Sequence, residues 1–260
     1  MTSAIIIILL VITAVYFVFR KKGKVTPAVI DLEPTEYKKL LTEHVAFYEK
    51  LDNTGKDRFE QMIADFLAET NIEGIGTEIT PLDRTLIASS AVIPIFGFPE
   101  WKYKNLTNVI LYPYTFDKDF QFEGENRNIM GMVGTGYMNG QMLLSRAALT
   151  KGFSKNSGKE NAAIHEFVHL LDKADGDTDG VPETFLPHEY AEPWLKMMHQ
   201  EMHKISDGHS DINPYAFTNE AEFLAVASEY FFEKPTELQH KHPELYADLS
   251  RIFGQNLAKE

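Results

Sequence analysis

Two histidines and one glutamate within five residues are the part of this chain best suited to chemistry. His165, Glu166 and His169 form the stretch HEFVH. On a helix, the two histidines lie one turn apart on the same face, so both rings can bind one tetrahedral zinc ion. Glu166 lies beside them and can take a proton from a metal-activated water and return it to a leaving amine. This stretch predicts a zinc-dependent hydrolase.

A helix around these residues is expected from the local sequence. Ser157 and Glu160 have the spacing of a capping box, and apolar residues dominate the stretch that follows. Such a short pattern also arises by chance, in which case the histidines would be ordinary core residues. Ionisable side chains are unfavourable on a buried helix unless they are paired or bound to a metal, which favours the metal site.

A catalytic zinc ion usually has three protein ligands and one position for water, so a third donor is needed. Glu222 is a carboxylate near the start of an otherwise apolar predicted helix at 220–232. Glu229, two turns further on, is either the ligand or an acceptor that orients a histidine. Asp175 is another option, but Asp172 stands where a metzincin has its glycine. Alternatively, Glu222 only stabilises the start of its helix.

Other candidates carry less weight. Tyr215 can donate a hydrogen bond to the oxyanion of a tetrahedral intermediate, although a tyrosine is often packed with its hydroxyl satisfied. His199 and His203 repeat the one-turn spacing, but Gln200 replaces the base, which indicates surface histidines. The acidic loop at 175–186 lacks the final glutamate of a calcium-binding loop. Asp172 can bond a histidine or simply end the helix.

Three motifs resemble one known family. They are HEFVHLLD at 165–172, the loop with Gly176 and Asp179 to Pro182, and Tyr215-Ala216 followed by AEFLAVASEYFF. Together they are similar to the Mlc titration factor A family, the M90 zinc peptidases, from about Arg58 to the C-terminal helix. That family is related to the catalytic domain of anthrax lethal factor, which implies a gluzincin-like fold.

The resemblance also implies roles for individual residues. His165, His169 and Glu222 would bind one zinc ion, Glu166 would be the general base, and Tyr215 would be a catalytic tyrosine. It further implies aminopeptidase-like activity on short peptides, although the residues themselves do not distinguish exopeptidase from endopeptidase. A regulatory protein that binds a sugar-responsive transcriptional repressor, with catalysis secondary, is the alternative function.

This chain departs from the family at two places. It begins with an apolar stretch that the soluble members lack, and Arg146 follows Leu144-Ser145 where they tend to carry tryptophan. The strand before Arg146 is a candidate edge for binding an extended peptide, in which case Arg146 would alter what the site accepts.

The apolar stretch at 4–19 contains no charge and is followed directly by Arg20 and three lysines. Its length approaches the ~20 residues of a membrane-spanning helix. A signal peptide would have its charges before the apolar run and a cleavage site after it, and neither is present. Basic residues stay on the cytoplasmic side, so we expect a single-pass inner-membrane protein with its catalytic portion in the cytoplasm.

Composition narrows the remaining choices. The 260 residues include no cysteine, so any metal must be held by histidine and carboxylate side chains. A formal net charge of −13 argues against direct binding of nucleic acid, which needs a basic face. The resemblance to the M90 peptidases implies a peptide or protein substrate instead.

The chain is divided into a membrane anchor with its basic flank at 1–24, a linker at 25–34 and a metallopeptidase domain at 35–260. Changes in hydrophobic period predict an α+β domain that is mainly helical, with a small sheet just before the zinc helix. Strands are expected at 109–112, 130–133 and 142–144. Helices are expected at 35–53, 54–72, 83–93, 191–205, 220–232 and 243–255.

Overall fold

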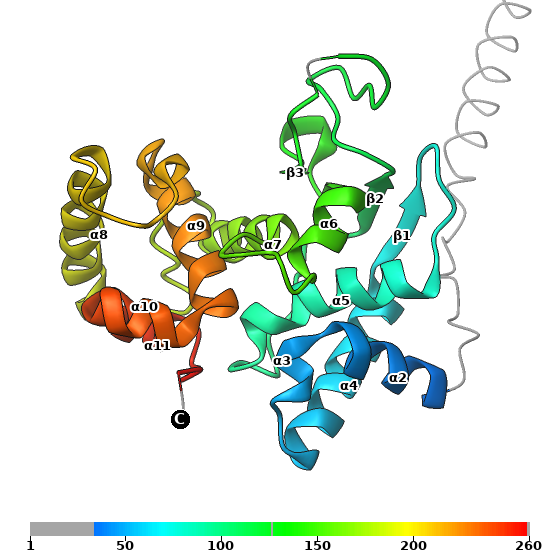
Figure 1. The fold of residues 1–260 in the computed structure, drawn as a ribbon, viewed down its shortest axis with the longest axis horizontal. Coiled ribbons are helices and arrows are strands. Elements are labelled where there is room, and N and C mark those ends of the chain that lie inside the picture. The colour runs from blue at the N-terminus through cyan, green and yellow to red at the C-terminus, as the bar shows by residue number, and fades with distance from the viewer. Residues whose placement is uncertain (1–33, 126, 259–260) are drawn as a thin grey trace, which may run out of the picture. The chain divides into compact units, whose positions relative to one another are not determined.

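A computed structural model describes residues 34–125 and 127–258 of the chain, all of which belong to one structural unit (Figure 1). The predicted membrane anchor at 4–19 and most of the predicted linker lie outside these residues. Within the described part, no helix has both the length and the apolar character needed to cross a bilayer.

The unit is mainly helical with one small sheet, as predicted. The helices are α2 (Pro34–His44), α3 (Ala46–Glu49), α4 (Asn53–Glu69), α5 (Pro81–Ile95), α6 (Arg146–Gly152), α7 (Ala162–Asp172), α8 (Ala191–Ser206), α9 (Glu220–Glu233), α10 (Pro235–Lys241) and α11 (Pro243–Ile252). The strands are β1 (Asn71–Gly74), β2 (Asn108–Tyr112), β3 (Gly131–Val133) and β4 (Gln141–Ser145). Single turns of 3-10 helix, among them η4 (Pro214–Phe217), lie between them.

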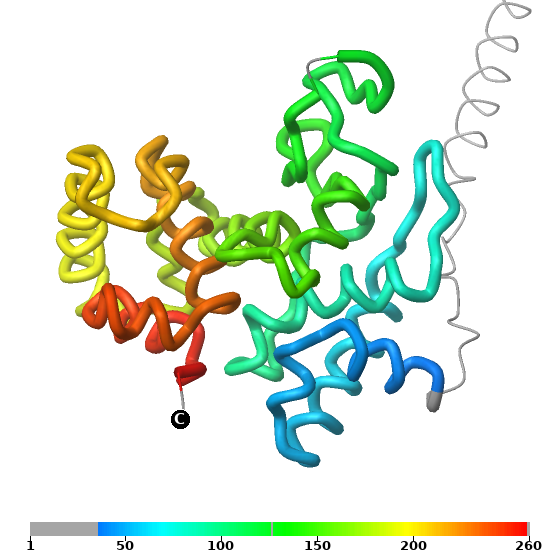
Figure 2. Tube along the Cα trace, in the orientation of Figure 1, coloured from blue at the N-terminus to red at the C-terminus, as the bar shows by residue number. Residues whose placement is uncertain are grey.

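Helix α5 is a buried helix that packs against α7, the helix that carries His165 and His169. Thr80 and Asp83 make a reciprocal capping box at its start, and nearly all of its residues are buried. It packs against α4 on one side and α7 on the other. The helix was expected to end at residue 93, but it continues to Ile95, with Pro94 in its last turn. Helices α5, α7 and α9 are far apart in sequence, but α7 packs against both α5 and α9, as the tube in Figure 2 shows.

The sheet has the strand order β1-β2-β4-β3. Strands β1, β2 and β4 run parallel, and β3 pairs with β4 in the antiparallel direction. Side chains of Val109, Leu111, Met142 and Leu144 are almost fully buried, as expected of parallel strands covered by helices. The three predicted strands are confirmed. Strand β1 was missed because NIEG is short and half polar.

Strand β4 is an interior strand, so the expectation that it forms a peptide-binding edge is wrong. Its neighbours are β2 and β3, and β3 is the strand at that end of the sheet. Arg146, the first residue of α6, forms a structural contact with Asp83. Its Nε and Nη2 atoms each donate to the Asp83 carboxylate over 2.8 Å. Arg146 therefore ties the end of β4 to the start of α5.

Candidate metal centre

Helix α7 carries both histidines, and its start differs from the predicted one. Asn161 is the N-cap, and its Oδ1 accepts a hydrogen bond from the backbone N–H of Ile164 over 3.2 Å. Neither Ser157 nor Glu160 caps the helix, so the predicted capping box is wrong. The apolar residues around the motif made the helix predictable, but a cap depends on where the backbone turns.

The two imidazoles lie side by side on one face of α7. The Nε2 atoms of His165 and His169 are 3.1 Å apart, and their ring centroids are 4.7 Å apart. Each side chain is mostly buried, with 12% of the His165 and 14% of the His169 side chain exposed. The one-turn spacing of the sequence thus brings the two nitrogens together as predicted.

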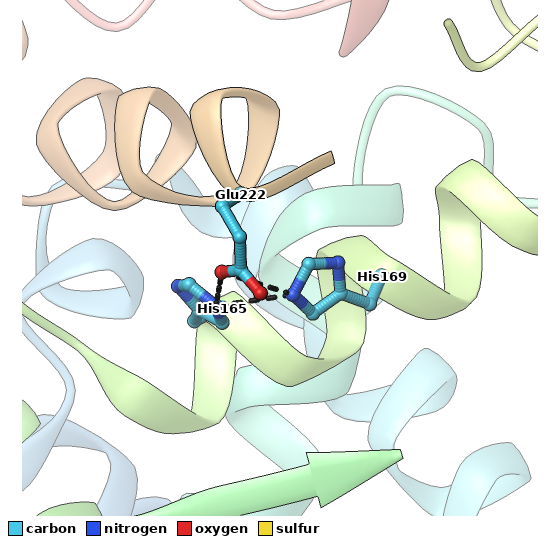
Figure 3. Close-up of side chains that lie close together, drawn as sticks. All are labelled: His165, His169 and Glu222. Atoms are coloured by element: carbon cyan, nitrogen blue, oxygen red, sulfur yellow. Dashed lines mark hydrogen bonds and ion pairs between the residues drawn. The ribbon is translucent and has the colours of Figure 1, made fainter. Parts of the chain in front are cut away.

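Glu222 reaches this pair from the first turn of α9, which packs against α7. Asn219 caps α9 by accepting a hydrogen bond from the Glu222 N–H over 2.9 Å. The Glu222 Oε2 atom is 3.0 Å from Nε2 of His165 and 3.6 Å from Nε2 of His169 (Figure 3). Donor atoms of these three residues all lie within 4.8 Å of one another. Among the described residues, no other group of His, Asp and Glu side chains meets in this way.

His165 and Glu222 stabilise each other's charged forms. Burial works against a charge on His165, but hydrogen bonds to Glu222 and Glu229 outweigh it and raise its pKa to about 10. Burial likewise opposes the charge of Glu222, but the hydrogen bonds from His165 and His169 lower its pKa well below the usual range. Glu222 therefore stays a carboxylate that can neutralise a cation beside the imidazoles.

Glu229 touches the opposite side of His165. Its Oε1 atom is 2.8 Å from Nδ1 of His165, and its Oε2 accepts a hydrogen bond from the backbone N–H of Asn161. A carboxylate at Nδ1 holds the proton on that nitrogen, so Nε2 is the nitrogen that can bind a metal once the proton it shares with Glu222 is released. Of the two roles open to Glu229, the geometry matches the orienting acceptor.

Glu166 is buried beside the imidazoles and below strand β3. Burial raises its pKa above the ordinary value, and this exceeds the opposing effect of His165 and His169. Gly131 of β3 covers it, because a Cβ atom at Gly131 would come within 2.7 Å of the Glu166 Oε1 atom. Sequence reasoning missed Gly131; a glycine inside a predicted strand is the signal of such a close approach.

Tyr215 lies on η4, the 3-10 turn that precedes α9. Its ring centroid is 6.2 Å from that of His165, and about half of its side chain is exposed. Burial and then the carboxylates of Glu222 and Glu166 raise the pKa of Tyr215. The phenol thus stays protonated at neutral pH and can donate a hydrogen bond toward the site.

The other candidates have separate roles. Both carboxylate oxygens of Asp175 accept backbone hydrogen bonds within its own loop. Asp172 accepts from the Gly180 N–H, and the Nδ1 atom of His169 has no hydrogen-bond partner among the described residues. His199 is exposed and 3.1 Å from Glu220, as expected of a surface histidine.

The donor set fits a divalent cation. Two imidazole nitrogens, deprotonated when the metal binds, and one carboxylate oxygen are the ligands of many catalytic zinc sites, and this cysteine-free chain has no thiolate alternative. The family profile described as glucose-regulated metallo-peptidase M90 matches residues 20–254. The chain belongs to the M90 peptidase family. A metal ion is implied by that membership.

Relatives of this M90 protein cover most of its length. An uncharacterized protein of Synechocystis sp. is 26% identical over 231 residues, which is 85% of this chain and 84% of that protein. Mlc titration factor A of Klebsiella pneumoniae subsp. pneumoniae is 29% identical over 221 residues, covering 79% and 81% of the two chains. Mlc titration factor A of Escherichia fergusonii is 28% identical over 195 residues, covering 70% and 71%.

Proposed function

We propose that this M90 protein is a zinc-dependent metallopeptidase with a gluzincin-like site, in which His165, His169 and Glu222 bind one zinc ion. The observation that carries the proposal is the meeting of these three donors within 4.8 Å, with the buried Glu166 beside them. Family membership supports the same function.

Each residue of the site then has a defined task. A bound zinc ion would polarise the scissile carbonyl and lower the pKa of water. Glu166 takes the proton from the attacking water and delivers it to the leaving amine, and its raised pKa makes it a stronger base than an exposed glutamate. Tyr215 donates a hydrogen bond from its phenolic O–H group to the oxyanion.

The peptide would extend along β3. This strand pairs with β4 on one side, and its other edge has no strand partner among the described residues. Gly131 brings the β3 backbone against Glu166, so a peptide that adds to the free edge passes close to the base.

Replacing the base tests this proposal. Glu166→Gln keeps the size of the side chain but cannot accept the proton, so we expect turnover to fall by about 10²–10⁴-fold. Zinc content should not change, because Glu166 is not one of the three ligands. The measurements are metal analysis of the purified full-length chain and cleavage of a peptide library with free and blocked N-termini.

The outcome of these two measurements is decisive. Glu166→Gln protein that cleaves peptides as fast as the wild type would overturn the role of the base. Wild-type protein that binds no zinc would overturn the metal site itself. A requirement for a free N-terminus would identify the aminopeptidase-like activity that the family resemblance implies.

We keep regulation by protein binding as the second candidate, because relatives carry the name Mlc titration factor A. In this case the chain would sequester a transcriptional repressor, with peptide cleavage secondary. A His169→Ala variant separates the two functions. If it loses zinc and still binds the repressor, binding does not depend on the metal centre; if Glu166→Gln alone abolishes function in the cell, the enzyme is favoured.

We further propose that residues 4–19 anchor the peptidase domain in the inner membrane, with the catalytic portion in the cytoplasm. The support is the uncharged apolar run followed by Arg20 and nearby lysines. A phosphatase that is active only in the periplasm, fused to the C-terminus, should stay inactive. An active fusion would reverse the orientation.

A further inference from the structure

Gly180 lies where the ends of three helices meet. Its backbone N–H donates to Oδ2 of Asp172, the last residue of α7, over 3.0 Å. Its carbonyl oxygen accepts from Nε1 of Trp194, in the first turns of α8, over 2.7 Å. Asp172 and Trp194 are almost fully buried, so both hydrogen bonds are shielded from water. The Gly180 backbone is therefore fixed from two sides.

The third neighbour of Gly180 is the first turn of α9. A Cβ atom at Gly180 would overlap the carbonyl oxygen of Glu220 and come within 2.6 Å of its carbonyl carbon. It would also lie 3.1 Å from the backbone nitrogen of Ala221. These are backbone atoms that cannot rotate away, unlike a side chain. Gly180 thus lies directly against the Glu220–Ala221 peptide unit, one residue before the metal-ligand candidate Glu222.

Trp194 holds the residue on the other side of Glu222. Its ring centroid is 6.1 Å from that of Phe223, and both side chains are buried. The indole that donates to Gly180 therefore also packs against α9. Glu222 lies between Ala221, which contacts Gly180, and Phe223, which contacts Trp194.

We infer that Gly180, held by Asp172 and Trp194, is a positioning residue for the metal centre, because it sets how closely the Glu222 end of α9 approaches the His169 end of α7. This inference rests on the proposed metal site. Metal-ligand distances tolerate only about ±0.2 Å. Displacement of the first turn of α9 by a methyl group at Gly180 would exceed that tolerance.

The test compares two glycine substitutions in the full-length protein. Gly180 and Gly208 both have positive φ, +79° and +71°, so alanine strains the backbone at each. A Cβ atom at Gly208 meets no heavy atom within 4 Å, whereas one at Gly180 meets α9. We expect Gly180→Ala to weaken zinc binding by about tenfold or more, measured by competition with a chelator, and Gly208→Ala to leave it within about threefold.

A double-mutant cycle distinguishes positioning from general destabilisation. If Gly180 acts through Glu222, Gly180→Ala should cause no further loss of zinc affinity in a Glu222→Gln background. The absorption spectrum of the cobalt-substituted protein should also change in Gly180→Ala and not in Gly208→Ala, since it reports the ligand geometry. Trp194→Phe keeps an aromatic side chain, although a smaller one, and removes the N–H donor; it serves as the second variant should Gly180→Ala not fold.

Different results would overturn the positioning role of Gly180 and the metal centre on which it rests. Equal zinc affinity of the wild type, Gly180→Ala and Trp194→Phe would overturn the positioning role and leave the metal site intact. The same holds if Gly180→Ala weakens binding equally with and without Glu222. Absence of zinc binding in the wild type would instead overturn the proposed metal centre.

Discussion

At the scale of single residues, each nitrogen of His165 has its own carboxylate. Glu229 is at Nδ1 and Glu222 is at Nε2, and both belong to α9. The seven-residue separation of the two glutamates is two helical turns, so both face α7. Helix α9 thus supplies both the candidate ligand, Glu222, and the carboxylate that orients the His165 ring, Glu229.

Glu229→Gln tests this orienting role. The amide can still contact Nδ1 but lacks the charge that holds the proton there, so we expect zinc affinity to fall by about 10–100-fold. Glu233→Gln is the control, because Glu233 is a partly buried glutamate on α9 that contacts Asn161 and Ser157 instead of a histidine. Chelator competition measures both. Equal affinities in the two variants would contradict the role of Glu229.

At the scale of elements, the site depends on how β4, α5 and α6 are joined. Arg146 links them through its paired hydrogen bonds to Asp83, which is also part of the capping box of α5. The bidentate geometry is specific to the guanidinium group. A charged residue that the sequence suggested as a specificity determinant thus holds together the elements beneath the site.

Arg146→Ala should therefore affect stability and leave specificity unchanged. It removes the partner of a buried carboxylate, and we expect the free energy of unfolding to fall by about 1–3 kcal/mol. Urea denaturation measures this loss, and the peptide-library profile provides the comparison. A changed cleavage profile at unchanged stability would show that Arg146 contacts the substrate after all.

At the scale of the whole molecule, a network of charges joins the C-terminal helices. His242, between α10 and α11, is 3.0 Å from Glu201 of α8 and 2.8 Å from Asp211 in the loop after it. Lys159 and Lys241 also pair with Asp211. The hydrogen bond to Glu201 and then that to Asp211 raise the pKa of His242, against the effect of burial.

This network gives a pH dependence of known sign. A folded-state pKa above the unfolded value of ~6.5 means that His242 stabilises the protein fully below pH ~6.5 and loses this contribution as pH rises through the folded pKa. We expect His242→Gln to lower the free energy of unfolding by about 1–3 kcal/mol near pH 6 and by less at higher pH. Denaturation across pH measures it, with exposed His240→Gln as the control. A pH-independent difference would contradict this assignment.

The sequence alone predicted which residues could form a metal site. The one-turn spacing of His165 and His169 fixes their relative position on any helix, and the apolar residues around them make a helix the expected structure. A carboxylate on an apolar helix needs a partner, which made Glu222 a candidate third donor beside Glu229 and Asp175, and the family resemblance ranked Glu222 first. The helical character and three strands of the domain followed from hydrophobic period for the same local reasons.

Only the tertiary structure decided what depends on contacts between distant segments. The cap of α7, the interior position of β4, the structural role of Arg146 and the two-sided support of His165 all involve residues far apart in the chain. Gly131 and Gly180 have no side chain whose chemistry indicates a function. Their importance comes from the residues that pack against their backbone. Local spacing defines which atoms can do chemistry, whereas packing defines where those atoms meet.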